Sequence, residues 1–116
     1  MKDDGFGICP EATVQTLLSG KWTLAILIRL SRKTMRFNEL QRELPSLTQA
    51  TLTKQLRTLE KNRLIVRTVY NQIPPKVEYS LSDIGEKFKP VIQAMKAWGE
   101  EYIIQMPRFF DKVEGQ

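Results

Sequence analysis

Three cationic side chains, Lys54, Arg57 and Lys61, recur at three- and four-residue spacing in the segment 37–62. On a helix, which turns by about 100° per residue, they share one side with Ala50. The opposite side carries the residues that would anchor the helix: Leu52, Leu56 and Leu59. Ammonium and guanidinium groups spaced in this way bind the phosphates of a polyanion. The chemistry predicted for this segment is therefore ionic binding of nucleic acid.

Charge is also segregated along the chain. Residues 29–76 hold eleven basic and three acidic residues, a net charge of +8, whereas the remaining residues carry a net charge of −3. A basic helix face is often no more than solvated surface. Concentration of the positive charge in one part of the chain favours a phosphate-binding face instead.

The cationic helix needs a partner helix to position it, and the sequence predicts one just upstream. Asn38 can cap this third helix of the chain, and Gln41 would complete a capping box. Pro45 prevents the helix from continuing, and Thr48 can then cap the cationic helix. Two helices joined by so tight a turn predict a helix-turn-helix, with the cationic helix in the recognition position.

Downstream of Asn62 the apolar period changes from helical to alternating. Ile65–Tyr70 and Val77–Leu81 predict two strands, joined by a loop that two prolines make stiff. A hairpin directly after a recognition helix is the wing of a winged helix, although an ordinary hairpin that covers the core would show the same strands. The predicted DNA contacts at its tip are polar or cationic: Asn71, Gln72 and Lys76.

Three further elements complete the expected first part of the fold. A first helix would begin at Pro10, end near Gly20 and bury these apolar side chains: Val14, Leu17 and Leu18. The segment Trp22–Leu30 is apolar almost all round, which predicts a central buried helix. A short extended piece around Met35 would follow it.

The C-terminal part predicts a helix from Asp83 to Met106 that either kinks or restarts at Pro90. It would be about 36 Å long, more than a small core needs to cover. An apolar stripe runs along it: Phe88, Val91, Ile92, Met95, Trp98, Tyr102 and Met106. We expect this stripe to form a homodimer interface, with Phe6 and Ile8 contributing. The alternative is that the N-terminal segment covers the stripe within one monomer.

Length and composition bound the remaining possibilities. The 116 residues suit a single domain that is mainly α with a small β-hairpin. The expected DNA-binding core covers about 20–82, the dimerisation elements about 6–19 and 83–110, and a polar tail begins near Phe109. No apolar run of about 18 residues occurs. The N-terminal residues lack a secretory pattern, and one cysteine cannot form an intramolecular disulfide, so we expect a cytoplasmic protein.

The chain resembles the HxlR-type winged helix-turn-helix regulators, which are akin to the MarR group, over about Cys9 to Tyr102. The run at the predicted wing, Pro74 to Leu81, is unusually specific. The other matching segments are Cys9-Pro10, Gly20-Lys21-Trp22, Arg36-Phe37-Asn38-Glu39-Leu40, Leu52-Thr53-Lys54-Gln55-Leu56-Arg57-Thr58-Leu59-Glu60 and Trp98-Gly99. The resemblance implies a homodimer that binds a palindromic operator in double-stranded DNA and regulates nearby genes.

Side-chain chemistry suggests a role for each candidate in such an interface. Gln49 can bond adenine, Arg57 or Lys54 can recognise guanine, and Ala50 can pack on a thymine methyl. Phosphate contacts are expected from Arg36, Asn38, Thr48 and Lys76. The other residues expected to face DNA are Thr51, Thr53, Lys61 and Gln72.

Cys9 is the one candidate for a chemical sensor. At the start of the first helix, the helix dipole would favour a reactive thiolate. Free cysteine is also a common buried apolar residue, so the alternative is a structural role. The resemblance favours sensing, because some HxlR-type regulators are thiol-based sensors. A small molecule could also bind among Trp22, Met95, Trp98 and Tyr102, although packing is the more ordinary role for these residues.

Two other classes of function are alternatives. A winged helix could bind an acidic protein through its basic face without recognising DNA. An enzyme is disfavoured, because the chain has no histidine, no Gly-rich phosphate loop and no metal-ligand cluster. The sequence therefore predicts no catalytic residue, no cofactor and no metal.

Overall fold

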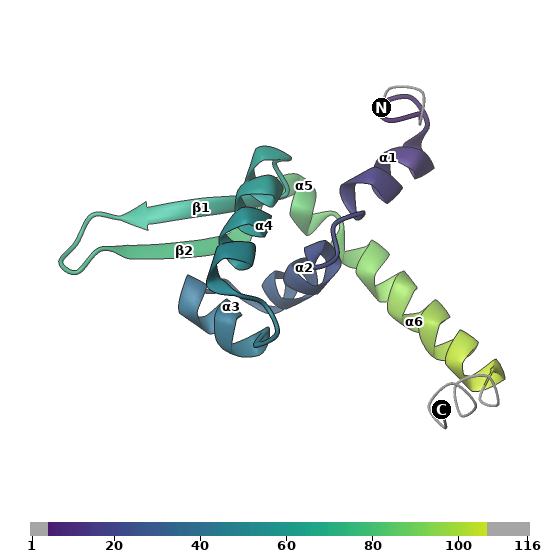
Figure 1. Ribbon diagram of the computed structural model, residues 1–116. Coiled ribbons are helices and arrows are strands. Elements are labelled where there is room, and N and C mark those ends of the chain that lie inside the picture. The colour runs from purple at the N-terminus through teal and green to yellow at the C-terminus, as the bar shows by residue number, and fades with distance from the viewer. Residues whose placement is uncertain (1–4, 107–116) are drawn as a thin grey trace. The chain divides into compact units, whose positions relative to one another are not determined.

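A computed structural model describes residues 5–106, which belong to two compact units. The first unit ends at Glu86 and the second begins at Lys87. In the first unit lie α1 (Pro10–Leu17), α2 (Thr23–Arg32), α3 (Phe37–Glu43), α4 (Gln49–Lys61), β1 (Ile65–Tyr70), β2 (Lys76–Leu81) and α5 (Asp83–Glu86) (Figure 1). The second unit contains α6 (Lys89–Gln105). The mainly helical fold with one two-stranded antiparallel hairpin is as predicted.

The core of the first unit is built from the aliphatic side chains of α2, α3, α4 and the strand ends. Ile26 and Leu27 of α2 are at most 1% exposed, as expected for a central helix. The three leucines predicted to anchor α4 are equally buried: Leu52, Leu56 and Leu59. Each buried leucine contributes about 1.5–3 kcal/mol, so this leucine edge fixes the orientation of α4.

The start of α3 differs from the prediction. Arg36, and not Asn38, is the N-cap residue, and its backbone N–H donates to Glu39 Oε1 at 2.8 Å. The Glu39 carboxylate thus bonds the backbone N–H of the N-cap residue Arg36, the role that Gln41 was expected to play for Asn38. Gln41 instead donates its side-chain amide to the carbonyl of Leu47 and holds the turn between α3 and α4.

Both ends of α4 are closed by local hydrogen bonds. At the N-terminus Thr48 is the predicted cap, and its Oγ1 accepts from the Thr51 N–H at 3.1 Å. At the C-terminus, Arg63 adopts the left-handed conformation with φ of 63°. The N–H groups of Arg63 and Leu64 bond to the carbonyls of Glu60 and Leu59, the pattern of a Schellman cap. This cap leads the chain directly into β1.

The wing pairs Ile65 with Leu81 at its base and Tyr70 with Lys76 near its tip. The predicted strands are therefore correct, with β2 beginning one residue earlier. Met35 forms an isolated bridge to Tyr79, with N···O distances of 3.0 and 2.8 Å in the two directions. At Tyr79, β2 is thus flanked by β1 on one edge and by Met35 on the other. The loop at the tip is exposed.

The N-terminal helix is packed less tightly than predicted. Pro10 occupies its first turn and Cys9 its N-cap position, as expected. Leu17 is half-buried, but Val14 is 39% exposed, and α1 contains no buried residue. The expectation that Val14 points inward is therefore wrong.

The predicted C-terminal helix is interrupted, and of the two alternatives the restart is correct. α5 ends at Glu86 and α6 begins at Lys89, which places Pro90 in the first turn. Proline is tolerated there because its missing N–H has no partner within a helix at that position. The 17 residues of α6 extend about 26 Å. Within residues 5–106, no helix combines the length and the apolar composition that a membrane crossing requires.

Candidate nucleic-acid interface

The exposed side of α4 carries the three cations predicted from the spacing. Lys54, Arg57 and Lys61 are exposed, while the leucine edge behind them is buried. None of the three makes an ion pair with a carboxylate of the described residues. Four other cations do have carboxylate partners: Arg29 with Glu43, Lys33 with Glu39, Lys76 with Glu78 and Lys96 with Glu100. The positive charge of α4 is therefore available to an external anion.

The N-terminal half of α4 offers fewer free hydroxyl groups than the sequence suggests. Gln49 and Ala50 are exposed, but Thr51 and Thr53 are half-buried. The Thr48 hydroxyl donates to Thr51 Oγ1 at 2.9 Å, and the Thr53 hydroxyl donates to the Gln49 carbonyl at 2.9 Å. These threonines therefore shape the start of the helix, whereas the Gln49 amide remains free to bond a base edge.

Arg36 and Asn38, the candidates on α3, are both exposed. The Arg36 N–H bond is the main reason that the pKa of the Glu39 carboxyl lies below its ordinary value, and the nearby cations Lys33 and Arg42 lower it further. Glu39 is thus an anion at neutral pH, which suits the first turn of a helix.

The wing candidates differ in how freely they could reach DNA. Asn71 and Gln72 are exposed in the loop. Lys76 is already engaged, because its Nζ lies 3.4 Å from Glu78 Oε2 and 4.8 Å from the centre of the Tyr70 ring. Ile73, which the sequence analysis did not single out, is fully exposed at the tip.

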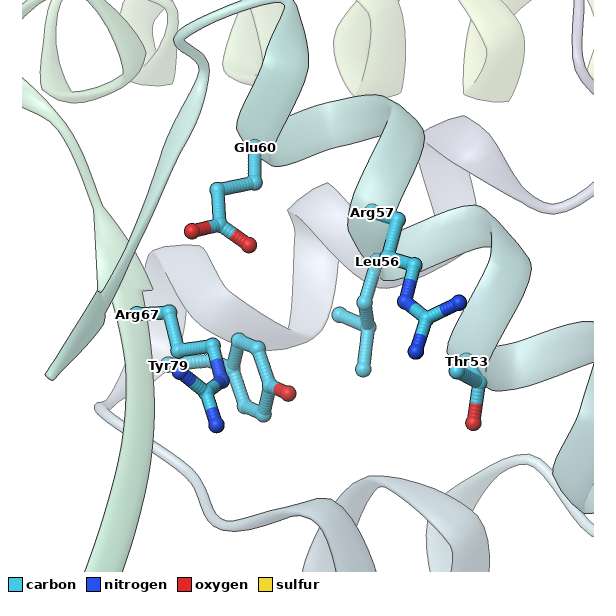
Figure 2. Close-up of a pocket in the computed structure, with 6 residues that line it drawn as sticks. All are labelled: Thr53, Leu56, Arg57, Glu60, Arg67 and Tyr79. Carbon is cyan, nitrogen blue, oxygen red and sulfur yellow. The ribbon is translucent and has the colours of Figure 1, made fainter. Parts of the chain in front are cut away.

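A cleft of about 370 Å³ separates α4 from the base of the wing. Its walls are formed by Thr53, Leu56, Arg57, Glu60, Arg67 and Tyr79, and Figure 2 shows these side chains turned toward the shared hollow. Arg67 and Tyr79 were not among the predicted site residues. Strand alternation could have found them, because Arg67 pairs with Tyr79 two residues beyond the buried pair Ile65–Leu81, so both lie on the core-facing side of the hairpin.

Cys9 is exposed, so a structural role as a buried apolar residue does not describe it. Its side chain forms no hydrogen bond to the backbone of the helix start. Instead, Sγ donates to Glu11 Oε1 at 3.6 Å. The thiol is therefore accessible to a reagent in solvent.

In the second unit, α6 exposes most of its predicted apolar stripe. Val91, Met95, Trp98, Tyr102 and Met106 are each at least 40% exposed. Ile92 is buried within the chain and Phe88 is half-buried, so neither offers much surface to a partner. Of the N-terminal candidates, Phe6 is 43% and Ile8 84% exposed.

A small hollow lies beside the aromatic residues of α6. The Trp98 and Tyr102 rings stack with centroids 5.5 Å apart. The hollow beside them has a volume of about 140 Å³, and its lining, Trp98, Glu101, Tyr102 and Gln105, comes entirely from this helix. Within residues 5–106, no cluster of three or more acidic or cysteine side chains could hold a metal ion.

Comparison with known proteins points to one family. A family model described as HxlR-like helix-turn-helix matches residues 17–107. The uncharacterized HTH-type transcriptional regulator YdeP of Bacillus subtilis (strain 168) is 48% identical over 99 residues, which cover 85% of this chain and 77% of YdeP. The oxidised redox regulator HypR is 43% identical, with a TM-score of 0.73 over 80% of this chain and 96% of HypR. Reduced YodB from B. subtilis is 31% identical, with a TM-score of 0.74 over 82% of this chain and 94% of YodB.

Proposed function

The chain belongs to the HxlR-like helix-turn-helix family of transcriptional regulators, and from this we propose that it acts as a homodimer on a palindromic DNA operator. The observation that carries the proposal is the state of α4, whose three cations are exposed and without carboxylate partners among the described residues. A helix whose leucine edge is fixed in the core presents these charges in one direction, which suits the DNA major groove.

Within the proposed complex, the residues of α4 and the N-cap residue of α3 divide into two roles. Gln49, Arg57 and Lys54 contact base edges and determine the operator sequence. Lys61 and Arg36 neutralise phosphates, which fixes the register of the helix but carries no sequence information. The exposed loop of the wing approaches the neighbouring minor groove. We also propose that the protein performs this activity in the cytoplasm.

The dimer is proposed to form through α6, with Phe6 and Ile8 adding to the interface. Five large apolar side chains of the stripe are at least 40% exposed. An exposed apolar surface of this kind marks a protein interaction site. In a two-fold dimer, the two copies of α4 would occupy half-sites about one helical turn, roughly 34 Å, apart.

Replacing Arg57 by alanine tests the assignment of α4. Fragments bound by the wild type are first selected from the source genome, and the affinity is then measured by fluorescence anisotropy. We expect Arg57→Ala to weaken operator binding by about 1–3 kcal/mol and to relax sequence preference at one base pair. Lys96→Ala is the matched control, because it removes the same charge from α6.

The outcomes separate the proposal from its main alternative. Wild-type binding that disappears at physiological salt for every fragment would indicate a protein-interaction module instead of an operator-binding regulator. An unchanged footprint and affinity for Arg57→Ala would remove Arg57 from the interface, whatever the wild type does.

We further propose that Cys9 makes operator binding sensitive to oxidants. Its thiol is exposed, and the similar structures include the redox regulator HypR and YodB in diamide-treated and quinone-bound forms. With one cysteine per chain, diamide would join the thiols of two protomers, or of one protomer and a small thiol, and would itself take up both hydrogens.

The sensitivity is tested by measuring operator affinity before and after diamide. We expect the wild type to change affinity by roughly 5- to 150-fold, the range of typical allosteric coupling, and Cys9→Ser to be unaffected. An equal change in both proteins, or in neither, would contradict a sensing role for this cysteine. Reduction with dithiothreitol should restore wild-type affinity.

A further inference from the structure

The proposed docking requires one DNA strand to pass between α4 and the wing. The major groove that would receive α4 and the minor groove that the wing tip would approach are neighbours on the duplex. A sugar–phosphate backbone separates any two neighbouring grooves. If α4 and the wing enter adjacent grooves, this backbone lies across the cleft between them.

The cleft has the chemistry to hold a phosphate. Arg57 approaches it from α4 and Arg67 from β1, and Figure 2 shows both guanidinium groups at the hollow. The Tyr79 hydroxyl is a further polar group along its walls, and buried Leu56 lies beside it. Two permanent cations face a single carboxylate, that of Glu60, so the lining carries an excess of positive charge.

The side chain of Arg67 is available to bind an anion, and its backbone is held in place by the hairpin. It is exposed, and it forms no ion pair or hydrogen bond through its side chain with the described residues. Its backbone is held in the paired part of the hairpin opposite Tyr79, which is itself bonded to Met35 on its other edge. A guanidinium on a fixed backbone loses less freedom on binding phosphate than one on an exposed loop would.

We propose that Arg67 is a DNA-phosphate ligand, which binds one backbone phosphate in the cleft between α4 and the wing, while the charge of Arg57 on the opposite wall adds to the positive potential there. This inference rests on the proposed function and adds a contact from the base of the wing. The Glu60 carboxylate repels the phosphate and so lowers the affinity for DNA of any sequence.

The test measures binding of the selected operator and of a random-sequence duplex over a series of salt concentrations. For Arg67→Ala we expect both affinities to fall by a similar factor, because a phosphate carries no sequence information. The log–log salt slope should become shallower by about 0.9, the contribution of one phosphate. Arg67→Lys should largely retain the slope, Glu60→Gln should strengthen binding of both duplexes, and Lys96→Ala serves as the charge control.

A second measurement locates the phosphate on the DNA. Single phosphates of the operator are replaced in turn by neutral methylphosphonates. One position should weaken wild-type binding and have no effect on Arg67→Ala, since the interaction is already absent there. Circular dichroism melting should show that Arg67→Ala remains folded, because the side chain is exposed and has no internal partner among residues 5–106.

The results distinguish this inference from the proposed function. If the wild type binds DNA but Arg67→Ala leaves its affinity and salt slope unchanged, the phosphate role of Arg67 is wrong and the regulator proposal stands. If the wild type binds no duplex, the proposed function itself fails. If inorganic phosphate at constant ionic strength raises the melting temperature of the wild type but not of Arg67→Ala, and the DNA slope is unchanged, the cleft holds a free anion and the inference is overturned.

Discussion

Replacement of Gly85 by alanine is expected to lower the free energy of unfolding of the first unit by about 3 kcal/mol. A Cβ atom at this position would clash with the carbonyl oxygen of Leu64. That contact is far below van der Waals distance, and the opposing atom belongs to the backbone, so no side-chain rotation can relieve it. In a domain of this size the melting temperature should fall by roughly 10–20 °C.

The close approach of Gly85 to Leu64 is part of a junction between three elements. The Gly85 N–H donates to Ser82 Oγ at 3.1 Å, and the Ser82 hydroxyl donates to the Arg63 carbonyl at 2.6 Å. The Ser82 N–H also donates to the Leu64 carbonyl at 3.0 Å. This junction joins the C-terminal cap of α4 to the end of β2 and the start of α5. Moving any member would disturb the support of the recognition helix.

Thermal unfolding followed by circular dichroism checks the Gly85 prediction. Ile84→Ala is a suitable control, because Ile84 belongs to the same short helix and is 56% exposed. Its truncation should change the free energy of unfolding by less than about 1 kcal/mol. A Gly85→Ala protein that melts within a few degrees of the wild type would show that the backbone of Leu64 can move away at little cost.

The sequence was sufficient where a local signal determines the structure. Leucine spacing predicted the buried edge of α4, Thr48 predicted its cap, and alternation predicted both strands. The family could also be identified from the sequence, chiefly through the run at the wing. In each case the deciding interaction lies within a few residues, so a short window of sequence contains it.

Predictions failed where two local signals competed or where the partner is distant along the chain. Asn38 is a good capping residue, but Glu39 reaches back to the Arg36 N–H and starts α3 two residues earlier. Gln41 is taken by the Leu47 carbonyl, a contact that exists only once the turn has formed. The cleft could not be predicted because Arg57 and Arg67 line it from two elements whose spacing depends on the folded core.

In the second unit, we expect substitution of Trp98 by glutamate to convert the protein from dimer to monomer. Trp98 is 69% exposed, the largest exposed fraction on the apolar stripe, so it has the most surface to bury against a partner. Removing a buried tryptophan costs about 2–3 kcal/mol, and two-fold symmetry places two copies in the interface. The dimer dissociation constant should therefore rise by roughly 10³- to 10⁴-fold, and the two new carboxylates would raise it further.

Sedimentation velocity distinguishes a species of 13.5 kDa from one of twice that mass. Gln93→Glu is the matched control, because it adds the same charge to the face of α6 roughly 140° away from Trp98. We expect this control to remain dimeric and Trp98→Glu to lose operator affinity as well, since two linked half-sites bind far more tightly than one. A wild type that is monomeric at micromolar concentration would refute the dimer directly. A Trp98→Glu protein that stays dimeric would show that the two copies associate through a different surface.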